Sequence, residues 1–234
     1  MLTLGPGVDG IIGFGPVDLT EGTVSGMSTV PTFMDNLYAQ KTISTEVLGV
    51  YFQPESGSDT DDLNGELTLG GTDPSKYSGS IIYTPTLKSG DFAPYWGITV
   101  SGITYSGSSI LGSNGAIVDT GTTLIYIPTA GYNKFLSAAG GTTDSSTGFA
   151  RFRTKPTGNL IFTIGGTGFT LTPAQYLVPM AEYSFFGLSS SYYYAWINDG
   201  GSSGVDFIIG QKFLESYYSV FDTTNSRVGF ATRT

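Results

Sequence analysis

Short apolar or alternating runs, separated by clusters of Gly, Ser, Asn and Pro, extend along most of the 234-residue chain. Brief runs of this kind are typical of β-strands rather than of helices. Two of them flank the glycine-rich stretch 165–168, which predicts a hairpin. We expect strands at Val47–Phe52, Glu66–Leu69, Tyr95–Val100, Ala116–Val118, Leu160–Ile164, Phe169–Leu171, Tyr192–Ile197, Ser219–Phe221 and Val228–Ala231.

Helical periodicity is confined to three short segments. Thr32–Gln40 places Phe33 and Leu37 four residues apart, which predicts one apolar helix face. Thr129–Ala139 follows a proline and ends before a glycine, and Thr172–Tyr176 begins with a cap residue and a first-turn proline. The whole pattern predicts an all-β fold with few helices, in one large domain or two modest ones.

The chain contains no histidine and no cysteine. A Ser–His–Asp triad, a Cys–His pair, a Cys/His zinc site and a disulfide are therefore excluded within these residues. The groups that remain for catalysis are 19 carboxylates, ten basic groups, 15 tyrosines and many aliphatic hydroxyls. This inventory favours chemistry that is carried by carboxylates.

Acidic residues outnumber basic ones, and the formal net charge is −9. Nucleic acid and anionic membranes are therefore not expected as partners, because phosphate contacts need clustered Lys and Arg. The densest basic cluster, Arg151, Arg153 and Lys155, has period-2 spacing, which we interpret as one solvated face of a strand. The chain also lacks an apolar run long enough to cross a bilayer as a helix.

One carboxylate stands out because it directly follows a strand that reads as buried. Ala116–Val118 leads into Asp119, Thr120, Gly121 and Thr122. A carboxylate in such a place needs hydrogen-bond donors, and this turn offers two hydroxyls and an unobstructed glycine amide. Asp-Thr-Gly alone is also ordinary turn chemistry, so the residues by themselves leave catalytic and structural roles open.

The segment Ala116–Thr123 resembles the second active-site motif of the pepsin-like aspartic proteases, and above all of the polyporopepsin-like enzymes of fungi. Further segments resemble landmarks of that family in the family's order: Asp9–Gly15, Gly65–Gly71, Tyr95–Val100, Phe207–Gly210, Phe213–Asp222 and Arg227–Ala231. The resemblance implies an all-β, bilobal fold. Residues 1–72 would form the tail of the first lobe and strands of the sheet between the lobes, and residues 73–234 the second lobe.

The same resemblance implies an aspartic endopeptidase, an acid protease that hydrolyses peptide bonds through a water activated by two carboxylates; this family is the standard example of that chemistry. Asp119 would be catalytic. The residues that would support its carboxylate are Thr120, Gly121 and Thr122, and those that would line the substrate cleft are Tyr95, Ile117, Thr123, Ile208 and Ile11. For Ile11, Ile117 and Ile208, the residues alone favour a place in the core.

In the family, a first Asp-Thr-Gly and a flap tyrosine precede the position that Asp9 matches, whereas Asp119 is the only Asp followed by Thr-Gly here. The resemblance is therefore expected to cover the last two-thirds of such an enzyme. We expect the 234 residues alone to have little or no peptidase activity. The family further implies a polypeptide substrate, a monomer, a location outside the cell or in a vacuole, and no metal or organic cofactor.

Three alternatives stay open at this point. The chain could be a non-catalytic remnant that binds peptides or a protein partner. Its aromatic content, 14%, would also suit a carbohydrate-binding sandwich or a carboxylate-pair glycosidase, although neither predicts the ordered motifs. In a dimer, two chains would each donate Asp119, as single-lobe retroviral enzymes do, but residues 1–72 would crowd that interface.

Overall fold

The computed structural model of the protein describes residues 9–54 and 64–234. Its strands are β1 (Val47–Tyr51), β2 (Glu66–Leu69), β3 (Tyr77–Pro85), β4 (Gly97–Tyr105), β5 (Ser108–Leu111), β6 (Asn114–Val118), β7 (Ile125–Ile127), β8 (Gly141–Thr143), β9 (Ala150–Phe152), β10 (Leu160–Ile164), β11 (Thr167–Leu171), β12 (Tyr193–Ala195), β13 (Ile197–Asp199), β14 (Ile208–Ile209), β15 (Tyr217–Asp222) and β16 (Arg227–Arg233). Its helices are α1 (Phe33–Ala39), α2 (Thr129–Ala139), α3 (Pro173–Tyr176), α4 (Tyr183–Phe186) and α5 (Gln211–Leu214), with short 3₁₀ turns at Val17–Thr20, Pro74–Lys76 and Met180–Glu182.

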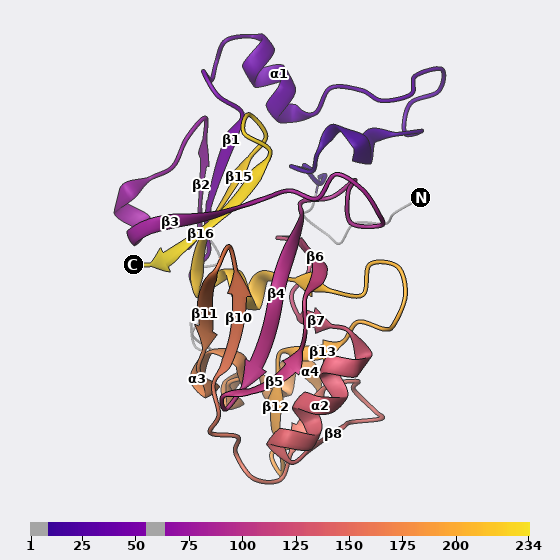
Figure 1. Ribbon diagram of the computed structural model, residues 1–234, viewed down its shortest axis with the longest axis vertical. Helices are drawn as coiled ribbons and strands as arrows, with labels where there is room; N and C mark the ends of the chain where they lie inside the picture. The colour runs from indigo at the N-terminus through magenta and orange to yellow at the C-terminus, as the bar shows by residue number, and fades with distance from the viewer. Residues whose placement is uncertain (1–8, 55–63) are drawn as a thin grey trace.

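Two sheets carry the fold, one above the other in Figure 1. The upper, five-stranded sheet has the order β2-β1-β15-β16-β3 and joins strands from both ends of the sequence. The lower, eight-stranded sheet has the order β11-β10-β4-β6-β14-β7-β13, and β5 pairs with β4. A third sheet has the order β12-β9-β8. The upper sheet uses strands on both sides of residue 72, and the boundary predicted there stays a prediction.

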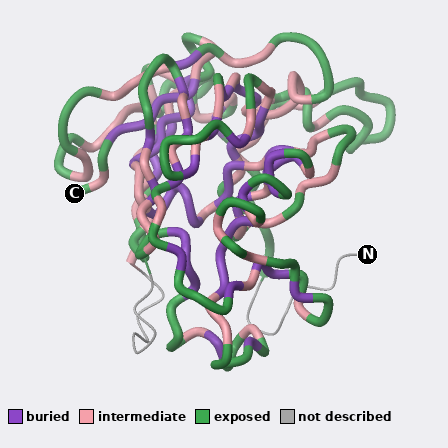
Figure 2. The backbone as a smooth tube through the Cα atoms, turned by 60° about the horizontal axis from the view of Figure 1, so that its bottom comes forward, coloured by how far each residue is buried: buried purple, intermediate pink, exposed green. Residues whose placement is uncertain are grey.

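The core is rich in aromatic side chains, and Figure 2 shows buried backbone within the sheets and exposed backbone along the outer loops. Phe213 is fully buried, and its ring centroid lies 5.4 Å from that of Phe162 and 5.7 Å from that of Phe230. This contact packs α5 between strands of the two sheets. A separate cluster beside it is formed by Phe149, Val178, Tyr183, Leu188, Tyr194 and Trp196.

The prediction of an all-β fold with few helices is confirmed, and the three predicted helices form with Thr32 and Thr172 as N-caps. The predicted strand Tyr192–Ile197 is wrong in one respect, because it divides at Trp196 into β12 and β13. The Trp196 amide donates to Tyr176 O at 2.9 Å, whereas its carbonyl accepts from the amide of Ile125 in β7 at 2.9 Å, so the chain changes pairing partners at this residue.

The basic cluster serves contacts within the fold. The Arg151 guanidinium lies 4.7 Å and that of Arg153 5.3 Å from the centre of the Tyr192 ring. Arg151 also pairs with the buried Asp144 at 3.4 Å. Both arginines thus stabilise the three-stranded sheet. Among residues 9–54 and 64–234, no helix combines the length and the apolar character that crossing a membrane requires.

Candidate active site

Asp119 lies at the carboxyl end of β6, between β4 and β14. Its amide donates to Ile209 O at 3.1 Å, and the amide of Val118 donates to Trp96 O at 3.0 Å. Strands β6 and β14 pair in parallel, with Ile117 opposite Ile208. Two neighbouring strands therefore fix the backbone of Asp119, and the segment Phe207–Gly210 lies beside it.

Each oxygen of the Asp119 carboxylate accepts one hydrogen bond from the turn that follows. The Gly121 amide donates to Oδ1 at 2.9 Å, and the Thr122 hydroxyl donates to Oδ2 at 2.6 Å. Two hydrogen bonds of this length fix the orientation of the carboxylate. Thr120 is exposed and donates to neither oxygen. The half-buried carboxylate keeps its remaining lone pairs for other contacts.

The turn that carries Thr122 is supported from behind by the start of α5. The Gln211 amide donates to Thr122 O at 2.7 Å, and the Lys212 amide donates to Thr123 O at 3.0 Å. A Cβ atom on Gly210 would overlap the carbonyl oxygens of Thr122 and Leu124. The close approach of two backbone segments therefore requires glycine at this position.

A cavity of about 410 Å³ opens beside Asp119. It is lined by Ile11, Ile12, Gly13, Phe14, Gly15, Leu19, Leu48, Tyr95, Trp96, Ile117, Val118, Asp119, Thr120, Gly121 and Phe221. Among these described lining residues, Asp119 carries the one carboxylate, and the walls are largely apolar. Such a combination suits a ligand with apolar groups around a polar reacting centre.

The structure brings most of the predicted cleft residues to this cavity and leaves two outside it. Tyr95, Ile117 and Ile11 line it together with Asp119. Ile11 is 72% exposed, so a place in the core is wrong for this residue. Ile208 packs beside Ile117 without lining the cavity, and Thr123 contributes its carbonyl to the α5 contact.

Sequence reasoning missed the aromatic walls. In the sequence, Trp96 and Phe14 are members of longer motifs and Phe221 is part of a predicted strand, whereas in the structure all three line the cavity. Phe14 lies 82 positions before Trp96 in the sequence, and Phe221 lies 125 positions after it. No local pattern could have shown that they face one another.

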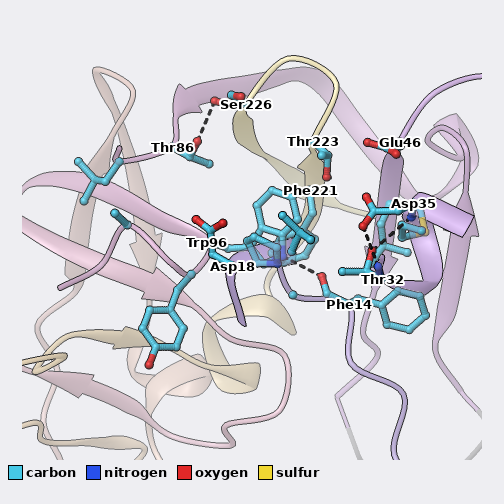
Figure 3. Close-up of a pocket in the computed structure, with 18 of the residues that line it drawn as sticks. Phe14, Asp18, Thr32, Asp35, Glu46, Thr86, Trp96, Phe221, Thr223 and Ser226 are labelled. Carbon is cyan, nitrogen blue, oxygen red and sulfur yellow. Dashed lines mark hydrogen bonds between the residues drawn. The ribbon is translucent and has the colours of Figure 1, made fainter. Parts of the chain in front are cut away.

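A second cavity, of about 260 Å³, adjoins the first and shares six lining residues with it: Phe14, Gly15, Leu48, Tyr95, Trp96 and Phe221. Figure 3 shows the carboxylate of Asp18 on one side of the Trp96 ring and those of Asp35 and Glu46 on the other. Burial, and then repulsion by and hydrogen bonding to Asp35, raise the pKa of Glu46 above its usual value. The fold therefore favours the protonated form of Glu46.

The raised pKa of Glu46 predicts that the substitution Glu46→Gln changes the stability of the protein by an amount that depends on pH. Because the pKa of Glu46 is higher in the folded than in the unfolded chain, its contribution to stability is complete below the ordinary value of about 4.3 and is lost as pH rises through the raised value. We expect Glu46→Gln to raise the Tm by about 1–3 °C near pH 7. Near pH 3 it should leave the Tm unchanged, as thermal unfolding at both pH values can measure.

The matched control is Glu21→Gln, since Glu21 is exposed and lies outside both cavities. It should leave the Tm unchanged at either pH. Asp18 and Lys88 also line the second cavity, so both stay unchanged in the Glu46→Gln and Glu21→Gln proteins. An equal gain from Glu46→Gln at both pH values would contradict the role given to the Glu46 charge.

Comparison with known proteins agrees with this geometry. The sequence profile of the family described as "Eukaryotic aspartyl protease" matches residues 3–233. Polyporopepsin of Irpex lacteus is 46% identical over 234 aligned residues, which cover 97% of this chain and 68% of that protein. Gastricsin of Cavia porcellus is 35% identical over 232 residues, which cover 96% of this chain and 53% of gastricsin.

The fold is similar as well. The crystal structure of an aspartic proteinase from Irpex lacteus matches with a TM-score of 0.89 and 45% identity, over 99% of this chain and 70% of that one. The chain thus spans about two thirds of the fungal relatives and about half of gastricsin. The resemblance to pepsin-like aspartic proteases is confirmed. The chain belongs to the eukaryotic aspartyl protease family.

Proposed function

We propose that Asp119 is one of the two catalytic carboxylates of an acid endopeptidase and that the 410 Å³ cavity is part of its substrate cleft. The observation that carries the proposal is the carboxylate of Asp119, held by donors from Gly121 and Thr122 at an apolar cavity. Family membership supports peptide hydrolysis in general. In this proposal, residues 73–234 form the second lobe and the preceding residues the tail of the first.

The chemistry needs two carboxylates that share one proton and hold a water molecule between them. One carboxylate takes a proton from the water, which attacks the peptide carbonyl carbon. The other donates its proton to the oxygen on which negative charge develops. Asp119 is oriented to act as either the base or the acid, because Gly121 and Thr122 occupy only one lone pair on each of its carboxylate oxygens. The second carboxylate would come from polypeptide other than the described lining residues.

The remaining predicted site residues take supporting roles in this proposal. Tyr95, Ile117 and Ile11 form walls of the cleft. Ile208 fixes Ile117 through the β14–β6 pairing, and the exposed Thr120 is free to contact the facing lobe. A polypeptide substrate, a monomeric state, and a place outside the cell or in a vacuole are proposals that rest on family membership.

We expect the purified chain of 234 residues to cleave a denatured protein no faster than its Asp119→Asn variant near pH 4, because one carboxylate cannot act as both acid and base at the same moment. The measurement is release of acid-soluble peptides, with circular dichroism to show that both proteins are folded. Clear cleavage by the chain that Asp119→Asn abolishes would contradict the requirement for a second carboxylate. Cleavage that survives Asp119→Asn would contradict the role of Asp119.

A second function, peptide binding without catalysis, is favoured by one observation. Ile11 and Ile12 are 72% and 65% exposed beside the cavity, and such apolar surface favours burial against a ligand. A non-catalytic binding protein would hold an apolar peptide equally well before and after the substitution Asp119→Asn. Titration of the unchanged chain and of this variant with one extended peptide, together with the cleavage assay, separates the two functions.

A further inference from the structure

Trp96 contacts three parts of the molecule that meet at the two cavities. Its indole N–H donates to Phe14 O at 2.9 Å, drawn as a dashed line in Figure 3. Its own carbonyl accepts from the amide of Val118 at 3.0 Å, one residue before Asp119. Its ring packs edge-on against Phe221 of β15, with the ring centroids 5.3 Å apart. One residue therefore links the Asp119 strand, the upper sheet and the segment around Phe14.

The segment 9–15 depends on this link. It forms neither helix nor strand. Within the described part of the chain, the bond from Trp96 is the one hydrogen bond that joins it to the rest of the protein. The ring of Phe14 also contacts the ring of Phe33 in α1, with the ring centroids 5.7 Å apart. Ordering an extended segment costs conformational entropy at every residue, so each of these few contacts has a large influence on whether the segment is ordered.

We propose that Trp96 is a positioning residue, whose indole N–H holds residues 11–15 as a wall of the cavity and sets the distance between that wall and Asp119. The chain of contacts is short and stiff. The carbonyl of Trp96 is fixed to the Asp119 strand, its ring is fixed by Phe221, and its N–H reaches Phe14. That this wall belongs to a substrate cleft rests on the proposed function, whereas the positioning itself does not.

The two cavities support the same inference. Trp96 and Phe14 line both of them, so the hydrogen bond between these residues lies at their boundary. A displaced Phe14 would join the 410 Å³ and 260 Å³ spaces and open the first to the carboxylates that line the second. Trp96 thereby determines which groups a ligand beside Asp119 meets.

The test removes the N–H and keeps the ring. Incorporation of β-(3-benzothienyl)alanine at position 96 replaces the indole nitrogen with sulfur, which cannot donate. Amide ¹⁵N relaxation in the intact chain then gives order parameters for residues 11–15 and for β6. We expect the order parameters of residues 11–15 to fall from about 0.85, the value of a rigid backbone, to below about 0.6, while those of β6 stay unchanged. Order parameters for the wall that stay near 0.85 would overturn the proposal.

Two controls separate positioning from a general loss of stability. At position 96, 5-fluorotryptophan keeps the N–H and should preserve the order of the wall. The benzothienyl residue at Trp196, which is 2% exposed in the separate aromatic cluster, should leave the wall ordered. Equal loss of order in the wall and in β6, or loss with 5-fluorotryptophan, would assign Trp96 a merely structural role. Failure of the peptidase assay would bear on the proposed function and leave these measurements unaffected.

Discussion

Replacing Gly210 with alanine is expected to destabilise the protein by about 1–3 kcal/mol, since forced overlap in a packed interior typically costs this much. The added Cβ would overlap the carbonyl oxygens of Thr122 and Leu124, and backbone atoms cannot turn aside as a flexible side chain can. Relief would require α5 to move away from the turn. That movement would break the hydrogen bond from the Gln211 amide to Thr122 O, now 2.7 Å long.

Urea unfolding of both proteins measures this effect. The matched control is Gly112→Ala, because a Cβ atom at Gly112 would meet nothing within 4 Å. It should change the free energy of unfolding by less than about 0.5 kcal/mol. If Gly210→Ala were as mild as the control, the close approach of α5 to the Asp119 turn would not be as tight as described.

Local patterns predicted the elements whose signal is contained in a few neighbouring residues. Helix α2 and strand β10 have their predicted bounds, because helical and alternating periodicity are properties of the segment itself. The sequence patterns do not predict strand β3, because Ser78, Gly79 and Ser80 place three small residues in its first half. Its place is set by pairing with β16, more than 140 residues later, and no local pattern carries that information.

In the candidate site, too, local patterns predict some contacts and not others. Gly121 and Thr122 lie two and three residues after Asp119, so the donors to its carboxylate could be inferred from the turn itself. The wall at Ile11 was reached only through family resemblance, and its anchor on Trp96 was not anticipated. A hydrogen bond between residues 82 positions apart depends on how the segment 9–15 packs against the turn before β4, which a linear pattern does not determine.

A completed enzyme is expected to lose at least about 10³-fold in kcat/KM when Asp119 is replaced by Asn, because loss of a general acid–base group commonly costs 10²–10⁴-fold and, in the proposed mechanism, Asp119 would act in every step. The completed enzyme joins the 234 residues to the part of polyporopepsin that carries the first Asp-Thr-Gly in the family's order. Asn can neither ionise nor carry the shared proton. Hydrolysis of a fluorogenic peptide near pH 4 measures both proteins.

The Asn variant should keep the geometry of the turn, so that the loss reports on chemistry. Its amide oxygen can still accept from the Gly121 amide, and the Thr122 hydroxyl can rotate to accept from the new NH₂ group. Asp18→Asn, in the second cavity, is the matched control and should retain activity within about threefold, since Asp18 does not line the space beside Asp119. Equal activity in the Asp119→Asn and Asp18→Asn proteins would show that Asp119 takes no part in the reaction.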